Sequence, residues 1–549
     1  MIDKELLLGA EVVARAALDE GLSGVYAYPG TPSTEITEFI QQSAEARSGK
    51  VRAAWSTNEK TAYEAALGMS FAGKRAMVCM KHVGLNVAAD AFINSAVTGV
   101  KGGMVVVVAD DPSMHSSQNE QDTRYYARFA QLPLLEPANQ QEAYDCVRYA
   151  FTFSEKMALP VLVRITTRLS HSRSTILRRP KRNPNPLIPD ANRRKWILLP
   201  ANARQQYQHL IGLQAQLVDA SENSPFNYIR GEELLPPSSG SAESAGTQSD
   251  LGIIAFGLAY NYVMEVITRH QLAIPVLKIA QYPLPEQKIR AYTRHFKRIL
   301  IAEEGYPIYE EGFRGFFGDS RFAGRLDGTL PRTGELTPDA LEKALVPDYT
   351  KTIRATPSIV APRPPELCQG CGHRDLYDAL NDAMQQYEHH HVFADIGCYT
   401  LGALPPYNAI NTCVDMGASV TMAKGAADAG LHPAVAVIGD STFTHSGITG
   451  LLDAVNDKSA LTILISDNYT TAMTGGQDSA ATNRIADICL GMGVDPAHLR
   501  TIVPLKKNHD ENVRILAEEF EFKGVSVIIA CRECIQTARR RKTNEATPH

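Results

Sequence analysis

Short β-rich runs alternate with helical segments along most of the chain, and this alternation restricts the fold more than any other feature. The first 175 residues contain the runs GVYAYPG, RAMVCMKH, GGMVVVVADDP and LPVLVRITT, separated by helical segments such as NEKTAYEAALGMSFAG. Strands that alternate with helices of this length pair in parallel, with helices on both faces of the sheet. The sequence therefore predicts an α/β fold.

Two interruptions divide this alternation into parts, as expected for 549 residues, which exceed what one hydrophobic core can hold. Residues 176–248 combine RRPKRNPNP, a helical pattern in ARQQYQHLIGLQAQLVDA and the low-complexity stretch PPSSGSAESAGTQS, which predicts a partly mobile connector. Residues 351–364 form a proline-rich linker. We therefore predict α/β domains at 1–175 and 365–537, a smaller α/β domain at 249–350, and a disordered tail at 538–549.

Composition excludes several classes of protein. A net charge of −5 gives no attraction to nucleic acid. No segment approaches the roughly 18–20 apolar residues that span a bilayer, and acidic residues interrupt the amphipathic N-terminal segment, so we expect a cytoplasmic protein. Nine cysteines are too few for a disulfide scaffold in a chain of this length, which favours metal binding or redox chemistry.

The stretch VAVIGDSTFTHSG and the later run LTILISDNYTT carry the strongest ligand-binding signal. Each is a β-branched strand that ends in polar residues, Asp440 after the first and Asn468 after the second. Ligands collect at the carboxyl ends of parallel strands, and hard oxygen donors suit Mg²⁺ that bridges a diphosphate. The small Gly439 is expected to let the backbone approach the ligand. The alternative is two ordinary strand-terminal turns.

The pair GD…DN follows the pattern of thiamine-diphosphate enzymes, usually GDG…N, with Ser441 in place of the last glycine. That cofactor needs a protonated carboxyl group in a dry pocket beside its aminopyrimidine ring. Glu59, in STNEKTAYEAALG, follows a strand-like run and opens a helix. The alternative for Glu59 is a first-turn glutamate that the helix dipole favours.

The segment CQGCGHRD, at residues 368–375, places two thiols and an imidazole within six positions. A structural zinc site needs four ligands, usually in two close pairs, but His373 follows Cys371 by only two positions and no second CxxC with a following histidine exists. A redox dithiol could act alone within a small thioredoxin-like fold. An iron–sulfur cluster needs four thiolates, which can be far apart in sequence.

Colinear motifs along nearly the whole chain resemble the 2-oxoacid:ferredoxin oxidoreductases, most closely the alpha subunits of the indolepyruvate type. These motifs are AYPGTPSTEI, STNEK, MKHVGLNVAADAF, SQNEQDTRYYARFA, RTGELTPDAL, CQGCGHR, ADIGCYTLGALPPY and GDSTFTHSGI. The resemblance implies two thiamine-diphosphate-binding, doubly wound parallel-sheet domains, the first for the pyrimidine and the last for the diphosphate. The domain at 249–350 would be a smaller, transketolase C-terminal-like α/β domain.

The resemblance also assigns roles to individual residues. Glu59 falls on the pyrimidine partner, and Thr31 on a residue that contacts the oxoacid. His82 is expected near the substrate as a polarising or proton-transfer group. The Mg²⁺ ligands and the other expected cofactor contacts are Asp440, Asn468 and Thr470, together with Gly439, Ser441 and His445.

Family members that carry a cluster beside the thiamine take its ligands from a CxxC, from a later Gly-Cys turn and from the end of the last strand. In this sequence those positions hold Cys368, Cys371, Cys398 and Cys534, with Cys531 as the competing fourth ligand. The resemblance therefore implies one [4Fe–4S] cluster. The other thiols lie in apolar surroundings and are expected to be buried and structural: Cys79, Cys146, Cys413 and Cys489.

The implied reaction is oxidative decarboxylation of an arylpyruvate to an aryl-acetyl-CoA and CO₂, with coenzyme A as co-substrate. Family alpha subunits typically continue into a ferredoxin-like module, which does not follow Cys534 here. Electrons are therefore expected to pass to ferredoxin or another external acceptor. A smaller beta subunit and an alpha2beta2 assembly are also implied. The alternatives are a non-oxidative 2-oxoacid decarboxylase and a non-catalytic redox-sensing protein on the same fold.

Overall fold

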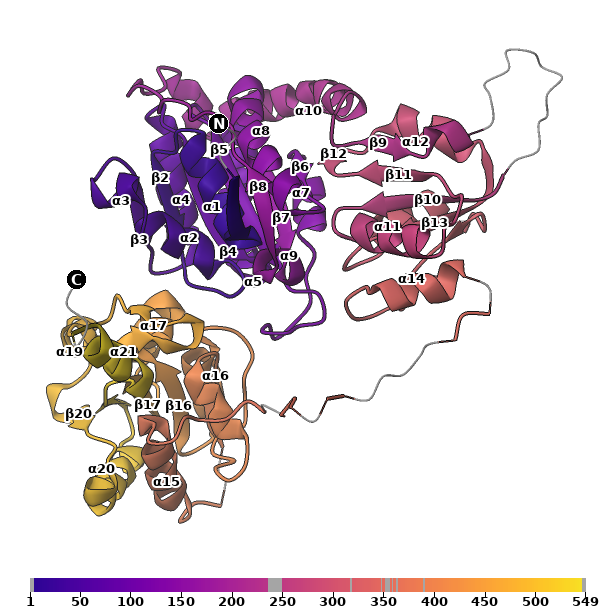
Figure 1. Ribbon diagram of the computed structural model, residues 1–549. Coiled ribbons are helices and arrows are strands. Elements are labelled where there is room, and N and C mark those ends of the chain that lie inside the picture. Colours follow the sequence, from indigo (N-terminus) through magenta and orange to yellow (C-terminus); the bar gives the residue numbers. More distant parts are fainter. Residues whose placement is uncertain are drawn as a thin grey trace. The chain divides into compact units, whose positions relative to one another are not determined.

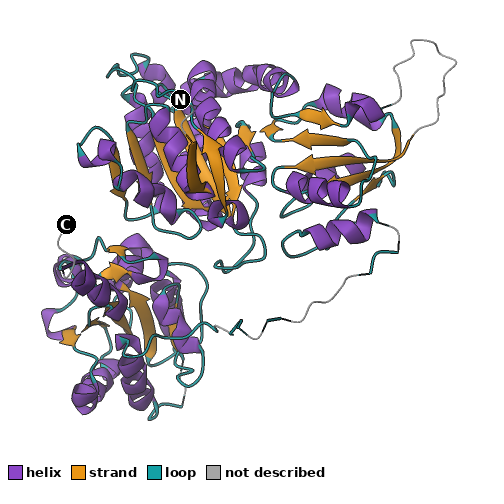
Figure 2. Ribbon diagram, in the orientation of Figure 1, coloured by secondary structure: helices purple, strands orange, loops and turns teal. Residues whose placement is uncertain are grey.

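A computed structural model describes residues 4–235, 249–315, 318–346, 348–350, 356–357, 359–361, 364–388 and 391–545 (Figure 1). The chain separates into two compact units, residues 1–354 and residues 355–549. In both units, strands form sheets with helices packed against them (Figure 2). No helix of the described residues is long and apolar enough to cross a membrane.

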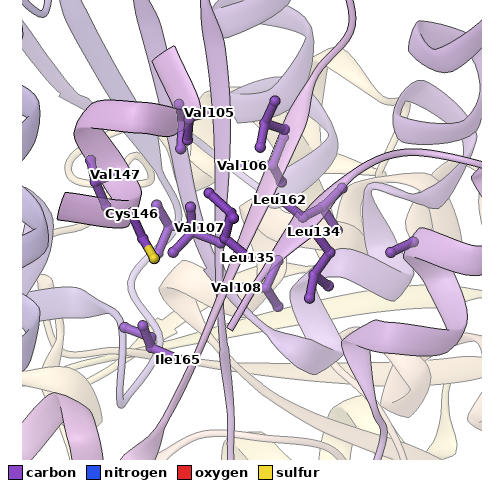
Figure 3. Close-up of a cluster of buried hydrophobic side chains, with 14 of the residues drawn as sticks. Val105, Val106, Val107, Val108, Leu134, Leu135, Cys146, Val147, Leu162 and Ile165 are labelled. Atoms are coloured by element: carbon purple, nitrogen blue, oxygen red, sulfur yellow. The ribbon is translucent and has the colours of Figure 1, made fainter. Parts of the chain in front are cut away.

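The larger sheet of the first unit has seven strands in the order β12-β6-β7-β5-β4-β2-β3, and the strands from β6 to β3 are parallel. Every residue of the central strand β5 is buried, so helices cover both faces of the sheet. Figure 3 shows β5 valines beside Cys146 and Val147 of helix α8 (Gln140–Met157). The strands are β2 (Gly24–Ala27), β3 (Arg52–Trp55), β4 (Ala76–Lys81), β5 (Met104–Asp110), β6 (Leu134–Leu135), β7 (Val161–Thr166) and β12 (Gln281–Tyr282).

The smaller sheet of the first unit has five strands in the order β14-β13-β10-β11-β9. Its strands β10, β11, β13 and β14 are parallel, and β9 is antiparallel to β11. This sheet corresponds to the predicted domain at 249–350, except that β12 pairs antiparallel with β6 of the larger sheet. The strands are β9 (Tyr228–Arg230), β10 (Ser249–Phe256), β11 (Val276–Ile279), β13 (Phe296–Ala302) and β14 (Phe322–Ala323).

The predicted connector at 176–248 contains more regular structure than expected. Its first residues complete β8 (Arg173–Leu177), which pairs with β1 (Lys4–Leu8), and its middle forms helix α10 (Pro200–Glu222). It also supplies β9 to the smaller sheet. The low-complexity residues 236–248 lie outside the described residues.

Buried ion pairs join the two sheets of the first unit. Helix α7 (Thr123–Ala130) carries Arg124, whose guanidinium lies 2.6 Å from Asp122 and 2.7 Å from Glu303, which follows β13. All three side chains are buried. Burial raises the pKa of Glu303 to about 7, although the charge of Arg124 opposes this rise. Arg124 therefore neutralises carboxylates from both sheets in a place that water does not reach.

Replacing Arg124 with leucine is expected to destabilise the first unit by about 3–5 kcal/mol, because Asp122 and Glu303 would stay buried without their counter-charge. Differential scanning calorimetry of the full chain measures this change. The matched control is Arg128→Leu, an exposed position on the same helix, which should change stability by less than about 0.5 kcal/mol. Equal shifts in the two variants would contradict a role for Arg124 in joining the sheets.

The second unit contains a five-stranded parallel sheet in the order β15-β16-β17-β21-β20. Alternate residues of β16 enter two separate cores: Val435 and Val437 pack with α15 (Gly372–Met384) and α20 (His509–Glu521), and Ala436 and Ile438 with α16 (Ala418–Asp428) and α18 (Ile448–Asp457). The strands are β15 (Val392–Ala394), β16 (Ala434–Gly439), β17 (Leu461–Asp467), β20 (Leu499–Ile502) and β21 (Val525–Cys531).

The end of the chain differs from the predicted disordered tail at 538–549. Helix α21 (Ile535–Glu545) occupies most of this segment, and residues 546–549 lie outside the described residues. The helix contacts the loop after β17, since Arg540 donates a hydrogen bond to the Gly475 carbonyl. Polar composition alone therefore misjudged a segment that packs on its own unit. Most of the linker at 351–364 also lies outside the described residues.

Candidate active site

The carboxyl ends of four neighbouring strands bring the predicted residues of the second unit to one edge of its sheet. Gly439 of β16 lies opposite Ser466 of β17, and Asp467 of β17 lies opposite Cys531 of β21. Asp440 and Asn468 therefore leave adjacent strands at the same level. Ligands of parallel sheets bind at this edge.

Asp440 is a buried carboxylate with an unused oxygen. Its side chain is buried and its Oδ2 has no hydrogen-bond partner. Burial raises the pKa of Asp440 to about 7, with a further contribution from the charge of Asp467, while Ser479 hydrogen-bonds to the carboxylate and opposes the rise. A buried carboxylate without a counter-charge is costly, and a bound cation would remove that cost. The residue thus fits the expected Mg²⁺.

The loop after β17 lies against the segment that starts with Asp440. The hydroxyl groups of Ser441 and Thr471 lie 3.0 Å apart and connect the two. Asn468 Oδ1 accepts a hydrogen bond from the Thr470 backbone N–H at 3.1 Å, and the Thr470 hydroxyl donates to the Gln477 carbonyl at 2.9 Å. These hydrogen bonds hold the turn in place. The atoms near Asp440 that could bind a cation are therefore oxygen atoms. Among the described residues, no three His, Cys, Asp or Glu side chains form a metal-binding group, so a cation here would need amide and carbonyl oxygens.

Gly439 makes room for an aromatic ring, and its expected close approach to the ligand stays a prediction. A Cβ at this position would lie 2.7 Å from the ring of Tyr399, so the missing side chain makes room for that ring. The Tyr399 hydroxyl donates to Asp395, a buried carboxylate that also accepts from the Ser419 hydroxyl at 2.6 Å. Sequence analysis missed Asp395, although it directly follows β15 in ADIGC.

His445 is buried within the turn that follows Asp440. Its Nδ1 lies 2.6 Å from the Ser446 hydroxyl, so a neighbouring side chain holds one ring nitrogen. The turn belongs to the π-helical segment Phe443–Gly447. The expected contact between His445 and the cofactor stays a prediction.

Two thiols at the same edge of the sheet, Cys398 and Cys371, have raised pKa values to which neighbouring thiols contribute. Burial raises the pKa of Cys398 to about 12, and nearby Cys371, Cys534 and Cys368 add to the rise. Burial likewise raises the pKa of Cys371, with contributions from Cys368 and Cys534. Cys531 instead faces Tyr469 and Asp467. Cys398 and Cys371 thus lie near other thiols of the expected ligand set, and the binding of a cluster stays a prediction.

Hydrogen bonds hold the CxxC segment against the residues that follow β21. Cys371 Sγ lies 3.2 Å from Nδ1 of His373, which is buried, and the Gln536 amide donates to Cys368 Sγ at 3.4 Å. Arg532 donates to the Gly370 carbonyl at 3.0 Å. Two segments far apart in sequence are therefore joined around the thiols.

Of the four thiols expected to be buried and structural, three are buried and one is not. The prediction is confirmed for Cys79, Cys146 and Cys489 and wrong for Cys413, which is exposed. Cys413 lies between β15 and α16 in a segment without helix or strand, where flanking apolar letters do not ensure burial.

In the first unit, Glu59, Thr31 and His82 follow the carboxyl ends of the neighbouring strands β3, β2 and β4. Glu59 is buried at the start of helix α4 (Glu59–Phe71). A Cβ at Gly84 would lie 2.6 Å from Glu59 Oε1, so the glycine provides the space that this carboxyl group occupies. The Thr31 carbonyl accepts a hydrogen bond from the Ser116 hydroxyl at 3.2 Å.

His82 is held by backbone groups on both sides of its ring. Nδ1 accepts from the Asp111 N–H at 3.3 Å, and Nε2 lies 3.1 Å from the Asn119 carbonyl. Burial lowers the pKa of His82, which keeps the ring neutral. Both nitrogens are therefore engaged, which favours a positioning role over the expected proton transfer.

Lys81, which sequence analysis missed, stands beside this histidine at the end of β4. Its Nζ donates to the Ser116 carbonyl at 3.1 Å, and its side chain lies against Gly30. Burial lowers the pKa of Lys81, while the charges of Asp111 and Glu59 oppose the change. The sequence signal that could have identified Lys81 was its position directly before His82 in MKHVG.

Comparisons with known proteins show the family of the chain. Residues 15–208 match the pyruvate flavodoxin/ferredoxin oxidoreductase thiamine-diphosphate-binding family, and residues 395–530 match the C-terminal binding domain of thiamine pyrophosphate enzymes. Indolepyruvate oxidoreductase subunit IorA of Methanothermobacter thermautotrophicus is 38% identical over 97% of this chain and 87% of that relative. The subunit IorA of Archaeoglobus fulgidus is 36% identical over 98% of this chain and 88% of its own length.

Among solved structures, 2-oxoglutarate:ferredoxin oxidoreductase from Magnetococcus marinus aligns with a TM-score of 0.49 and 17% identity, over 59% of this chain and 62% of that chain. The two matched domains and the full-length relatives define the class, that of thiamine-diphosphate-dependent 2-oxoacid oxidoreductases. The chain belongs to the family of indolepyruvate oxidoreductase IorA subunits. The predicted fold class and family resemblance are confirmed.

Replacing Asp440 with asparagine should stabilise the cofactor-free chain at pH 8, on the order of 2–4 kcal/mol, because each tenfold change in acidity corresponds to about 1.4 kcal/mol. The pKa of Asp440 rises from 3.8 to about 7 on folding, so its charge destabilises the fold increasingly as pH rises between these values and fully above pH 7. Urea unfolding between pH 5 and pH 8 measures this dependence.

The control for this prediction is Asp453→Asn, at an exposed position on α18. It should leave the free energy of unfolding within about 0.5 kcal/mol at both pH values. If Asp440→Asn lowered stability at pH 8, the carboxylate would have a partner in the folded chain, and the cation site would lose its physical basis.

Proposed function

We propose that the chain is the thiamine-containing subunit of an enzyme that oxidatively decarboxylates arylpyruvates of the indolepyruvate type. The products are an aryl-acetyl-CoA and CO₂, and coenzyme A is the co-substrate. The observation that carries the proposal is the set of four thiols at the same sheet edge as the unused carboxylate oxygen of Asp440. The names of the relatives support the choice of an indolepyruvate-type substrate.

In this proposal Asp440, the Asn468 side chain and the Thr470 carbonyl hold Mg²⁺, and Gly439, Ser441 and His445 line the same binding site. Glu59 donates a hydrogen bond to the pyrimidine half of the cofactor, and its burial in the first unit supports that role. Bound thiamine diphosphate supplies a carbon nucleophile for the oxoacid ketone. Thr31 orients the oxoacid carboxylate, and His82 fixes the loop around it.

Cys368, Cys371, Cys398 and Cys534 would bind one [4Fe–4S] cluster, which supplies one-electron transfer. The raised pKa values of Cys398 and Cys371, to which the neighbouring thiols contribute, support the ligand set, and the position of Cys531 beside Tyr469 and Asp467 supports Cys534 as the fourth ligand.

The complete enzyme would include a smaller beta subunit, in an alpha2beta2 assembly, and would act in the cytoplasm. The subunit names of the relatives support a partner chain. The electrons would pass to ferredoxin or another external acceptor. A non-oxidative decarboxylase would form an aldehyde and contain no iron. A redox-sensing protein would have no use for Glu59, Asp440 and Asn468 together.

The decisive experiment is anaerobic purification with the beta subunit, followed by iron and sulfide analysis and visible spectroscopy. We expect about four irons and four sulfides per chain. The spectrum should bleach when indolepyruvate and coenzyme A are added. Glu59→Gln should keep the iron and abolish the bleaching, whereas Glu64→Gln, an exposed position on the same helix, should preserve both. An iron-free protein that forms aldehyde would instead establish the decarboxylase.

The fourth cluster ligand can be identified with a pair of serine variants. Cys534→Ser should lose most of the iron, because oxygen replaces one of four thiolate ligands. Cys531→Ser should retain wild-type iron content, because Cys531 faces Tyr469 and Asp467. The reverse result would assign the ligand to Cys531. Iron content and the electron paramagnetic resonance spectrum of the reduced protein are the measurements.

A further inference from the structure

His373 is a buried polar side chain that lies against one of the four thiols. It belongs to the first turn of α15, and 3% of its surface is exposed. Its Nδ1 lies 3.2 Å from Cys371 Sγ, and its Nε2 has no hydrogen-bond partner among the described residues. The ring packs at a tilt against Tyr399, with 6.4 Å between the ring centroids. Packing therefore directs one ring nitrogen at a sulfur and leaves the other in a dry environment.

Burial decides which nitrogen of this ring carries the proton. It favours the neutral imidazole, which has a single N–H group. With the proton on Nε2, that N–H would be unpaired, and the Nδ1 lone pair would face the lone pairs of a Cys371 thiolate. With the proton on Nδ1, the N–H donates to the thiolate, and a single acceptor stays unpaired. Because unpaired buried polar groups are costly, a thiolate at Cys371 selects the Nδ1–H form.

The hydrogen bond from His373 differs from that of Gln536 in its access to water. Gln536 donates to Cys368 Sγ at 3.4 Å, but both residues are exposed, so a water molecule can replace the amide. The His373 ring is buried, and Cys371 is half-buried. A ring of similar size without nitrogen would therefore leave no donor in the place of this N–H. The backbone N–H of His373, which also hydrogen-bonds to Cys371 Sγ, would remain.

We propose that His373 is a positioning residue that donates its Nδ1–H to Cys371 Sγ and thereby raises the reduction potential of the cluster. The inference rests on the proposed function, because it concerns the cluster of that function. Reduction adds one electron and no proton, and the thiolate sulfurs share the added negative charge. A hydrogen bond to such a sulfur stabilises the reduced form more than the oxidised form.

The direction of this effect suits the chemistry of the site. Oxidative decarboxylation releases two electrons for each oxoacid, and a one-electron centre takes them one at a time. A higher potential shifts each of the two transfers toward the reduced centre. Because water does not compete for the buried N–H, His373 keeps the same hydrogen bond in both redox states.

The test replaces His373 in the anaerobic holoenzyme and follows the cluster by electron paramagnetic resonance during a redox titration. His373→Phe keeps a buried ring and removes the N–H. At a fixed solution potential, we expect the ratio of reduced to oxidised cluster to fall roughly tenfold, which is about 59 mV toward lower potential for a one-electron couple. His373→Asn, whose amide N–H replaces the Nδ1–H, should restore most of the wild-type potential.

The matched control is His509→Phe, the same substitution at a half-exposed histidine that begins α20. His509 lies 2.8 Å from Asp382, toward the other end of α15 from His373. The control should have the wild-type potential. An equal shift in both variants would contradict the assignment of the effect to the hydrogen bond with Cys371.

A second measurement uses the wild-type protein and so does not depend on the folding of a variant. The protein is prepared with histidine that carries ¹⁵N in the imidazole ring alone, which excludes the backbone N–H of His373. Pulsed electron paramagnetic resonance of the reduced protein then detects ring nitrogens that couple to the cluster spin. We expect a coupling in the wild type and its loss in His373→Asn.

The possible results separate this role from the proposed function. Equal potentials of the wild type and His373→Phe, each with full iron content, would overturn the role of His373 and leave the proposed function intact. A wild-type protein without iron would overturn both. If His373→Phe lost its iron, the ¹⁵N coupling in the wild type would decide, and its absence would refute the hydrogen bond.

Discussion

Parallel pairing of β15, β16, β17 and β21 is the constraint on which the site of the second unit depends. It places the residues after four separate strands at one level, so that Asp440, Asn468, Cys398 and Cys534 come from distant parts of the sequence. Hydrophobic side chains on both faces of the sheet fix that level, because a shift in register would turn buried residues outward. The two cores therefore determine the geometry of the polar edge.

The two units differ in whether their buried charged groups have partners. Around Arg124, carboxylates and guanidinium groups neutralise one another, which ties the two sheets of the first unit together. At Asp440, one carboxylate oxygen has no partner. Unpaired buried polar groups are rare in folded proteins and often mark sites where a ligand completes the pairing. The contrast distinguishes a structural network from a binding site.

The sequence predicted the fold class well, because β-branched runs and helical periodicity are local signals. It also predicted the strand ends that carry Asp440 and Asn468. It could not show that the Gly439 position accommodates the ring of Tyr399, because that contact joins residues far apart in the chain. Partial burial of Lys81 and exposure of Cys413 also depend on tertiary packing. Helix α21 was missed because its polar residues carry no hydrophobic period, while its contacts with Cys368 and Gly475 lie outside any local window.

Strand β12 bears on the order in which the strands of the first unit can pair during synthesis. Residues 281–282 pair with β6, which belongs to a sheet formed otherwise by residues 24–166. During synthesis the larger sheet would be nearly complete while the edge of β6 still lacked its partner. Open sheet edges invite pairing with other chains, and very short edge strands limit that risk. Because β6 has only two residues, the edge that waits for residues 281–282 offers other chains little to pair with.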